Sequence, residues 1–340
     1  MKNLLKQLVT DTPLSAQQAE DAFTIIMSGA ADAAQIGALL ALLAIRSPTT
    51  EEIIGAATVM RRNVIPIAAS ADVVDTCGSG GVGSRFFNIS TTAAIIAAAC
   101  GVQVAKHGNR SVTSRSGSAD VLRCLGVNVE TTPEQEARCL ATTGICFAFA
   151  PRHHPAMKHV AAIRQQLGFA TLFNVIGPLT NPANSRRQLI GVRSPHAADQ
   201  MLECLIRLGA RRAMAVNGKD LGSGPMCELS VCGTTYVAAF DGQQTHKFEL
   251  EPADAGLAVH APEELEINGP EESAQMVRQV LEGKPGGPRD IALLNTAGAL
   301  WVGGATDDLR QGVQRAARAV DDGAARATLE KLTRCSHEAC

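Results

Sequence analysis

The chain has 340 residues, of which 46% are hydrophobic and 19% charged, so it can bury a large core. Aromatic residues make up only 3%, which indicates an aliphatic, alanine-rich interior that suits close helix packing. The formal net charge of −2 argues against a broad electrostatic surface for nucleic acid, and the chain lacks the run of about 18 apolar residues that a membrane span needs. We therefore expect a cytoplasmic protein that binds neither nucleic acid nor membrane.

Residues 1–70 have a helical pattern. Ser15 and Thr49 each begin a capping box, Ser-x-x-Gln and Thr-x-x-Glu, ahead of an apolar-periodic run. Between them, Ile36–Ala44 is apolar on almost all sides, which suits a helix buried on several faces or at a subunit interface. The pattern predicts a small all-helical N-terminal domain, residues 1–70, and we expect helices from about 165–185 to join it.

Strands and helices alternate from residue 71 onward. Val73–Val74 and Gly101–Ala105 are predicted strands, and Ser90–Cys100 is a predicted helix between them. Val127–Val129 is a further predicted strand, and Thr132 opens a third capping box. Later predicted elements are strands at Ala210–Val216 and Thr235–Phe240, and helices at Met157–Leu167, Glu271–Gly283 and Asp308–Asp322.

This alternation predicts an α/β fold for residues 71–340, with a mainly parallel sheet flanked by helices. Ligands of such sheets bind at the carboxyl ends of the strands. Two polar loops follow predicted strands and therefore fall at that edge.

The first polar loop, Cys77–Gly83, is rich in glycine and leads to Asn88, Ser90 and Thr91 at the start of a helix. Glycines let the backbone approach an anion, and the N-terminus of the helix adds unpaired donors and a positive dipole end. The loop predicts an anion site. A tight turn from strand to helix is an equally acceptable interpretation of the same residues.

The second polar loop, Lys106–Ser118, carries three cations, one histidine, one asparagine and five hydroxyl groups in thirteen residues. Charge-assisted hydrogen bonds from Lys and Arg, with hydroxyls filling the remaining acceptors, suit an oxyanion such as pyrophosphate. The alternative is a solvated loop without a ligand.

Three motifs resemble the signature of anthranilate phosphoribosyltransferases. They are Lys106–Val112 continuing through Ser114 to Asp120, Ala150–Lys158 with Arg164 on the same predicted helix, and Phe173–Pro182. The resemblance extends from the helical N-terminus to about residue 330. It implies transfer of a phosphoribosyl group from phosphoribosyl pyrophosphate to anthranilate, with release of pyrophosphate, in tryptophan biosynthesis. It also implies a homodimer paired through the helical part.

The resemblance also implies residue roles. Anthranilate would be held by Gly78, Asn109 and Arg164, with Arg164 pairing its carboxylate, while Ser90 and Glu228 would hold Mg²⁺. His107 and His154 would tune or position groups, with a plain structural role as the alternative, and Lys106 and Arg164 are the expected catalytic residues. Phosphoribosyl pyrophosphate would be held by Gly78, Ser79, Gly80, Gly81, Asn88, Ser90, Thr91, Lys106, His107, Gly108, Asn109, Arg110, Ser111, Ser114 and Ser118.

The chemistry of such a transfer agrees with these residue types. Displacing pyrophosphate from a ribose C1 builds positive charge on the sugar and negative charge on the leaving group. Catalysis then consists of positioning the amine and stabilising the leaving anion. Lys106 and Mg²⁺ suit the second task, and no strong general base is needed.

Three positions depart from the family's pattern. The family's glycine loop runs Gly-Thr-Gly-Gly-Asp-Gly, whereas Val82 stands at its acidic position. Phe86 occupies a position that usually holds Ser or Thr. Cys227 replaces the Asp of an Asp-Glu metal pair, and the loop before it is a few residues longer. All three changes remove oxygen atoms, and Mg²⁺ is poorly served by sulfur.

The departures leave several hypotheses open. Weaker magnesium binding with activity retained is one, and the intact Asn109 and Arg164 favour it. A different acceptor is another, because Val82 and Phe86 make this corner more apolar. A relative that binds without turnover is a third. A pyrimidine-nucleoside phosphorylase, whose glycine loop is similar, is a fourth, although the loop Lys106–Ser118 does not fit it.

Overall fold

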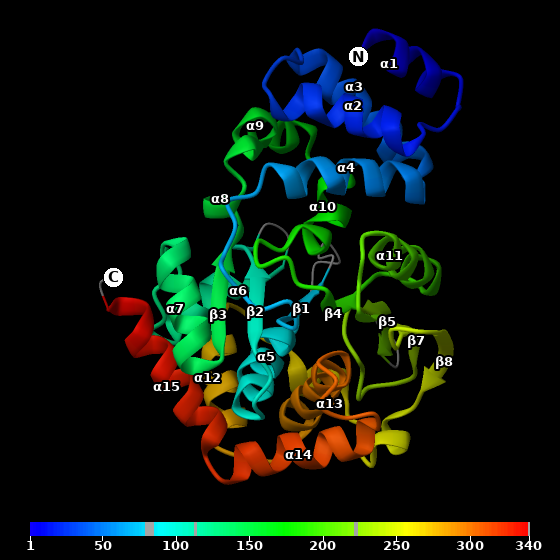
Figure 1. Ribbon diagram of the computed structural model, residues 1–340. Coiled ribbons are helices and arrows are strands. Elements are labelled where there is room, and N and C mark those ends of the chain that lie inside the picture. The colour runs from blue at the N-terminus through cyan, green and yellow to red at the C-terminus, as the bar shows by residue number, and fades with distance from the viewer. Residues whose placement is uncertain (79–84, 112–113, 221–223, 339–340) are drawn as a thin grey trace.

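The computed structural model describes residues 1–78, 85–111, 114–220 and 224–338, and Figure 1 shows their arrangement. Its N-terminal part consists of α1 (Lys2–Val9), α2 (Ala16–Met27), α3 (Ala33–Arg46) and α4 (Thr50–Arg62). Helices α8 (Ala150–His153), α9 (Lys158–Leu167) and α10 (Leu172–Ile176) come much later in the chain. Of these, α9 packs on α2 and α3, and α10 packs on α3 and α4.

The predicted capping boxes form in the structure. The Ser15 and Thr49 hydroxyls accept from the backbone N–H groups of Gln18 and Glu52, whose side chains accept from the cap residues in return. Thr132 makes the same box at the start of α7 (Pro133–Thr143). These helix starts are local, because each box lies within four residues of sequence.

The larger part is built on a twisted sheet with strand order β3-β2-β1-β4-β5-β7-β8. Strands β3 to β5 in this order pair in parallel, and β7 and β8 continue the sheet antiparallel. A short strand, β6 (Gly224–Met226), pairs with the end of β5. The strands are β1 (Val74–Gly78), β2 (Val104–Gly108), β3 (Ile145–Phe149), β4 (Arg187–Gly191), β5 (Arg212–Asp220), β7 (Thr235–Phe240) and β8 (Thr245–Leu250).

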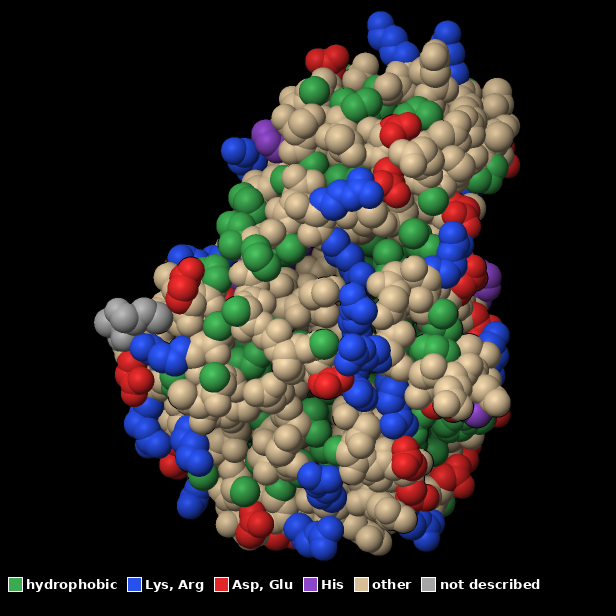
Figure 2. Space-filling model, in the orientation of Figure 1, with side chains coloured by type: hydrophobic (Ala, Val, Ile, Leu, Met, Phe, Trp, Pro, Cys, Tyr) green, Lys and Arg blue, Asp and Glu red, His purple; other side chains and the backbone are tan. Residues whose placement is uncertain are grey.

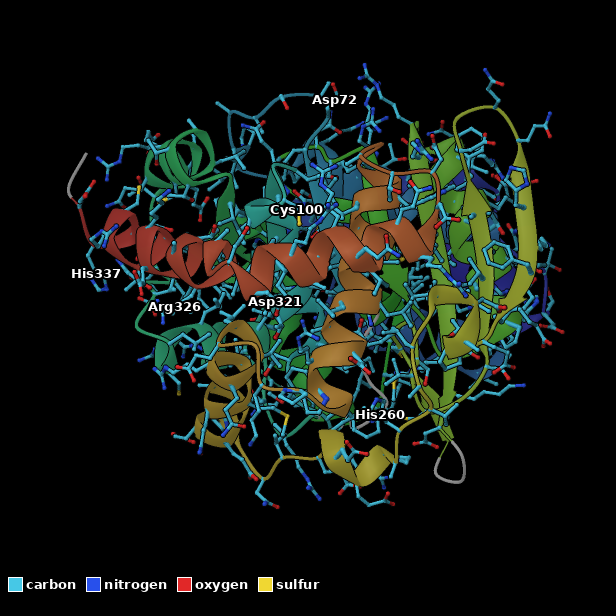
Figure 3. All side chains as sticks on the ribbon, turned by 90° about the horizontal axis from the view of Figure 1, so that it is seen from below. Asp72, Cys100, His260, Asp321, Arg326 and His337 are labelled. Carbon is cyan, nitrogen blue, oxygen red and sulfur yellow. The ribbon has the colours of Figure 1, made fainter. Side chains whose placement is uncertain are left out.

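Helices cover both faces of this sheet. On one face, α5 (Ile89–Ala99) and α13 (Gly287–Val302) lie together against the central strands, and α14 (Leu309–Asp321) and α15 (Ala324–His337) pack outside them. Figure 3 shows α14 and α15 crossing the underside of the molecule. On the other face, α11 (Pro195–Arg207) packs on β5 and β7. The remaining helices are α6 (Ser118–Cys124) and α12 (Pro270–Leu281), and 3₁₀ turns occur at Pro155–Met157, Gly177–Thr180, Pro252–Ala255 and Pro262–Leu265.

The predicted fold, a small helical part and a larger α/β part with a mainly parallel sheet, is confirmed. Two strand predictions need correction. The predicted strand Val127–Val129 is not a strand: Val127 and Val129 are buried, but the backbone N–H of Asn128 donates to the Ser336 hydroxyl of α15 at 3.0 Å. The segment therefore packs against a helix rather than a strand. The strand predicted at Gly101–Ala105 begins later, at Val104, and carries Lys106 and His107 into the sheet.

The surface in Figure 2 mixes both signs of charge, with a narrow column of Lys and Arg side chains down the middle of this face. Asp72 pairs with two arginines, Arg187 at 3.1 Å and Arg211 at 2.9 Å. Among the described residues, every helix is too short or too polar to span a bilayer.

Candidate active site

A cavity of about 340 Å³ opens at the carboxyl ends of β1 and β2, beside the N-terminus of α5. The predicted edge of the sheet is therefore the place where the cavity lies. Its lining is drawn from three stretches of chain that are far apart in sequence, within 77–90, 106–118 and 220–228. The lining residues are Cys77, Gly78, Arg85–Ser90, Lys106–Asn109, Ser114, Ser116–Ser118, Asp220 and Pro225–Glu228.

Asn88 joins the two polar loops at the back of the cavity. Its side-chain oxygen accepts hydrogen bonds from the hydroxyls of Ser116 and Ser273, each at 2.7 Å, and its backbone N–H donates to Ser273 at 3.1 Å. Backbone bonds from Phe87 to Leu265 (3.0 Å) and from Ile267 to residue 85 (2.9 Å) pin the same segment to residues 265–267. The start of α5 is thus fixed by tertiary contacts rather than by a local cap.

Lys106 lies on β2 with its side chain buried (3% exposed) and its ammonium group at the cavity. The ammonium donates to the carbonyl of Thr76 and lies 3.3 Å from the Ser90 hydroxyl. Burial lowers the pKa of Lys106, and the nearby carboxyl groups of Asp75 and Glu228 oppose this by raising it. A buried cation of this kind is stabilised when an anion enters the cavity.

Glu228 and Cys227 also line the cavity. Burial raises the pKa of Glu228 to about 7, against the lowering effects of Lys106 and of hydrogen bonds from Ser90. Burial also raises the pKa of Cys227 to about 12, so this side chain is a neutral thiol at physiological pH. The charge of Lys106 and the hydrogen bonds from Ser90 thus do not fully offset the cost of burying an ionised Glu228. The neighbouring Cys227 thiol offers no oxygen ligand.

These donors fit a magnesium ion that takes most of its ligands from elsewhere. Mg²⁺ keeps several waters and is commonly held by one or two carboxylates together with substrate phosphates. Glu228 supplies the carboxylate and Ser90 the hydroxyl, and a cation there would favour the ionised form of Glu228. Among the described residues, no three His, Cys, Asp or Glu side chains cluster as a metal cage, so the protein alone provides a sparse ligand set.

His107 and His154 form a buried pair at the side of the cavity. Their Nε2 atoms lie 3.3 Å apart, and only His107 reaches the lining. Burial lowers the pKa of His154 to about 4 and holds the pKa of His107 well below its usual value. Neighbouring histidines lower both pKa values further, because they disfavour a second positive charge. Both rings are neutral at pH 7 and can orient a polar ligand without adding charge.

The structure does not bring every predicted site residue to the lining. Arg164 lies on α9, where its guanidinium donates to Asn174 at 3.3 Å and stacks over the Phe173 ring at 5.3 Å. Thr91 is buried behind the cavity, and its hydroxyl has no hydrogen-bond partner within the described structure. Arg110 is exposed and pairs with Glu130 at 2.9 Å.

Ser111 also lies behind the lining and belongs to the turn of the second loop. Its backbone N–H donates to Asp120 at 2.9 Å, and its hydroxyl contacts that of Ser114 at 2.9 Å. A side chain on Gly117 would overlap the backbone of this same turn, so the close approach requires glycine. Ser79, Gly80, Gly81 and Val82 lie outside the described residues.

Two charged cavity residues were missed by sequence reasoning. Arg85 lies 2.8 Å from Glu266 and 3.9 Å from Asp220, and it stacks over the Phe86 ring at 5.5 Å. Asp220 ends β5 and lines the cavity. The extra length of the loop before Cys227 was the feature of the sequence that could have drawn attention to Asp220. The sequence alone did not show that the Asp220 carboxyl group would lie at the cavity.

Comparison with known proteins decides the family. A family described as "Glycosyl transferase family, a/b domain" matches residues 70–326, and its "helical bundle domain" matches residues 2–64. The anthranilate phosphoribosyltransferase of Rhodopseudomonas palustris is 45% identical over 331 residues, which cover 97% of each chain. That of Rhodospirillum rubrum is 47% identical, covering 98% of this chain and 94% of the relative.

The chain belongs to the anthranilate phosphoribosyltransferase family. The family's enzyme from Thermus thermophilus superposes with a TM-score of 0.91 at 36% identity, covering 98% of this chain and 99% of that one. The Saccharomyces cerevisiae enzyme, solved in complex with phosphoribosyl pyrophosphate and Mg, superposes with a TM-score of 0.87 at 28% identity, covering 98% and 96%. Within the family's fold, Phe86 and Cys227 line the cavity of this chain.

Proposed function

We propose that the chain transfers the phosphoribosyl group of phosphoribosyl pyrophosphate to the amine of anthranilate and releases pyrophosphate, as a step of tryptophan biosynthesis. The observation that carries this proposal is the meeting of Lys106, Ser90 and Glu228 in one cavity. Buried positive charge, hydroxyl donors and a carboxylate for a metal are the groups that a bound diphosphate needs. Full-length membership of the family supports the same reaction.

The phosphoribosyl pyrophosphate would lie along the two polar loops. Gly78 and Gly108 leave room for the substrate near the strand ends, and Asn88, Ser90 and Lys106 face it from the start of α5 and from β2. Ser79, Gly80, Gly81, Thr91, His107, Asn109, Arg110, Ser111, Ser114 and Ser118 complete the proposed binding set. Lys106 would stabilise the leaving pyrophosphate, because its charge already lies at the cavity before the reaction begins.

The acceptor would lie between the cavity and α9. Arg164 would pair with the carboxylate of anthranilate, and the stacking on Phe173 holds the guanidinium plane in place for that contact. Asn109 and Gly78 would contact the ring from the cavity side, and His107 and His154 would hold its amine in line with ribose C1. Because both imidazoles are neutral, they need not act as strong bases.

For magnesium, we propose Ser90 and Glu228 as the protein ligands. A bound Mg²⁺ would supply neutralising charge to the pyrophosphate as it leaves. The ionised Glu228 would hold the cation at the carboxylate, and Ser90 would keep Glu228 oriented through its hydrogen bonds. The Cys227 thiol would leave one ligand position to water.

The organisation of the chain supports the same enzyme. We propose that residues 1–70, with helices from about 165–185, form a helical domain and that residues 71–340 form the domain that binds phosphoribosyl pyrophosphate. Family matches to residues 2–64 and 70–326 support this division. Two exposed apolar residues of the helical part, Val9 (70%) and Ile45 (83%), suit a homodimer paired there. We expect the enzyme to be cytoplasmic.

The direct test is the loss of anthranilate fluorescence on mixing purified protein, phosphoribosyl pyrophosphate and a magnesium series. Loss that requires both substrates supports the transferase. Retained fluorescence, in a protein that calorimetry shows to bind phosphoribosyl pyrophosphate, would favour a different acceptor or a binding-only role. The neutral thiol of Cys227 beside the proposed metal ligands is the observation that favours this second candidate. Phosphate-dependent cleavage of thymidine or uridine would instead favour a nucleoside phosphorylase.

A further inference from the structure

A buried histidine next to the acceptor side fastens three separate segments of the chain. His153, at the end of α8, is fully buried (0% exposed). Its Nδ1 lies 2.7 Å from the carbonyl oxygen of Ile65, and the backbone N–H of Ile65 donates to the carbonyl of His153 at 2.9 Å. Ile65 lies in the segment that leads from α4 to β1, so these two bonds join α8 to the passage between the helical and α/β parts.

The other ring nitrogen of His153 faces a carboxyl group. Its Nε2 lies 2.8 Å from Oε2 of Glu136 on α7, and Glu136 is also buried (1% exposed). The Thr131 hydroxyl donates to the second oxygen of Glu136 at 3.3 Å. The ring therefore bridges α7 and the segment around Ile65, and both side chains are buried.

For both contacts of the His153 ring to be favourable, His153 and Glu136 together need one proton more than a neutral imidazole and an ionised carboxyl group carry. A neutral imidazole has a single N–H, and here Nδ1 donates it to the carbonyl of Ile65. Nε2 would then present a lone pair to a carboxylate oxygen at 2.8 Å, which is repulsive in a buried site. An additional proton held between Nε2 and Oε2 removes this repulsion, and neither atom has another hydrogen-bond partner among the described residues. Burial raises the pKa of Glu136, which favours retention of that proton.

Few other charges face this pair. Arg152 lies on α8 beside His153, and its charge lowers the pKa of Glu136 less than the contacts of Glu136 with His153 and Thr131 do. The remaining neighbours are neutral at pH 7, since burial raises the pKa of the thiols and lowers that of the imidazoles. These neighbours are Cys139 on α7, Cys146 on β3, His107 on β2 and His154.

Glu136 and His153 are connected to the cavity through His154, the next residue of the chain. His154 follows His153 directly, and its Nε2 lies 3.3 Å from that of His107, which lines the cavity. The backbone at residue 153 is held by Ile65 and its ring by Glu136, so the position from which His154 projects is fixed from two sides. Lys106 lies on β2, Ser90 on α5 and Glu228 just after β6, so none of the three is held by this link.

We propose that Glu136 and His153 are positioning residues for the acceptor, which hold His154 against His107 through a shared proton. The inference rests on the proposed function, because it assigns the His107–His154 pair to the acceptor side. The pair should therefore affect anthranilate much more than phosphoribosyl pyrophosphate. A purely structural role would change both substrates together, or only the stability of the fold.

The test compares Glu136→Leu with Glu136→Gln in the full chain. Leu keeps the volume but leaves Nε2 without a partner, and we expect the KM for anthranilate to rise about tenfold or more, with the KM for phosphoribosyl pyrophosphate within about twofold of wild type. Gln can donate an N–H to the Nε2 lone pair of a neutral His153. It should restore the KM for anthranilate to within about threefold at neutral pH.

The pH profile distinguishes a shared proton from simple packing. In the wild type, the KM for anthranilate should rise at alkaline pH, when the extra proton leaves the pair. Glu136→Gln should lack this alkaline rise, because the amide does not titrate. The matched control is Asp290→Asn at His260 (labelled in Figure 3), where an imidazole and a carboxylate also lie 2.8 Å apart but outside the cavity lining. This variant should keep both KM values and the wild-type pH profile.

Equal changes of both KM values in Glu136→Leu, or the same alkaline rise in Glu136→Gln as in wild type, would overturn the inference and leave the proposed function intact. Absence of anthranilate transfer by the wild-type enzyme would instead overturn the proposed function, and this inference with it.

Discussion

The ammonium group of Lys106 lies 3.3 Å from the hydroxyl of Ser90, so strand β2 and the first turn of α5 meet at one point of the cavity. The two residues come from different predicted loops, and the parallel pairing of β1 with β2 brings these loops to the same edge of the sheet. A cation, a hydroxyl and an N-terminal helix turn at a single point form a site for the negative charge of a leaving pyrophosphate.

Removing the charge of Lys106 should mainly slow the chemical step. We expect Lys106→Met to lower kcat by about 10²–10³, because a preorganised charge at a developing anion typically contributes that much. Steady-state kinetics with both substrates checks this. Lys247→Met, which removes an exposed lysine paired with Asp199, is the control and should leave kcat unchanged. A Lys106→Met enzyme with wild-type kcat would exclude Lys106 as the stabiliser of the leaving group.

Arg164 should select for the carboxylate of the acceptor. We expect Arg164→Ala to raise the KM for anthranilate by about tenfold to a hundredfold, since a charge-assisted pair is lost, and to change the KM for phosphoribosyl pyrophosphate far less. The comparison is Arg326→Ala, an exposed arginine of α15 (labelled in Figure 3). Equal effects of Arg164→Ala on both substrates would rule out the assigned pairing.

Cys227 should set the magnesium requirement. We expect Cys227→Asp to lower the magnesium concentration for half-maximal activity by about tenfold, because an oxygen ligand replaces a neutral thiol. Cys227→Asn has a similar shape without the charge and should produce a smaller decrease. A magnesium titration of activity measures the effect. An unchanged titration in Cys227→Asp would place Cys227 away from the metal.

The raised pKa of Glu228 predicts a pH dependence of metal binding. Burial raises this pKa to about 7, so the carboxyl group is increasingly protonated as pH falls below 7 and the metal must displace its proton. The magnesium concentration for half-maximal activity should therefore rise by up to about tenfold per pH unit below pH 7. In Glu228→Gln this dependence should disappear. A wild-type requirement that stays constant from pH 8 to pH 6 would contradict a metal role for Glu228.

In the metal-free protein, the raised pKa of Glu228 makes the fold less stable as pH rises, whereas metal binding improves as pH rises. A carboxyl group whose pKa is higher in the folded state than in the unfolded state favours folding when it is protonated. Its contribution is fully present below the ordinary pKa of 4.5 and is lost as pH rises toward about 7. Denaturant titrations of metal-free wild type and Glu228→Gln should converge at low pH and separate at neutral pH, with the Gln variant the more stable.

Gly191 should be intolerant of any side chain. A Cβ at this position would overlap the carbonyl oxygen of Cys227, so the end of β4 packs directly on Cys227. We expect Gly191→Ala to lower the free energy of unfolding by about 1–3 kcal/mol and to weaken phosphoribosyl pyrophosphate binding. Gly37 in α3 has open space around it, and Gly37→Ala should instead raise stability by about 0.5–1 kcal/mol. Denaturant unfolding and calorimetry measure both. A Gly191→Ala protein as stable as wild type would show that Cys227 can move away.

The sequence alone predicted the local features and the family. Capping boxes at Ser15, Thr49 and Thr132 formed because all their atoms lie within one helical turn. The polar loops fell at the carboxyl edge of the sheet because parallel strands align their ends. Predicting the segment Val127–Val129 as a strand was wrong because apolar residues at this spacing serve a helix contact as well as a strand.

Only the tertiary structure decided which side chains share the site and in what charge state. Lys106, Ser90 and Glu228 are separated by long stretches of chain, and their contact depends on how β1, β2 and the β5–β6 hairpin converge. The same convergence brings Asp220 to the cavity, whereas Arg164 lies on α9, which packs on α2 and α3. Charge states follow burial, because removing a group from water shifts its pKa by an amount that sequence spacing does not encode. The sequence thus determined the chemical groups and the order of the elements, and packing determined the neutral histidines, the raised pKa of Glu228 and the proton shared by Glu136 and His153.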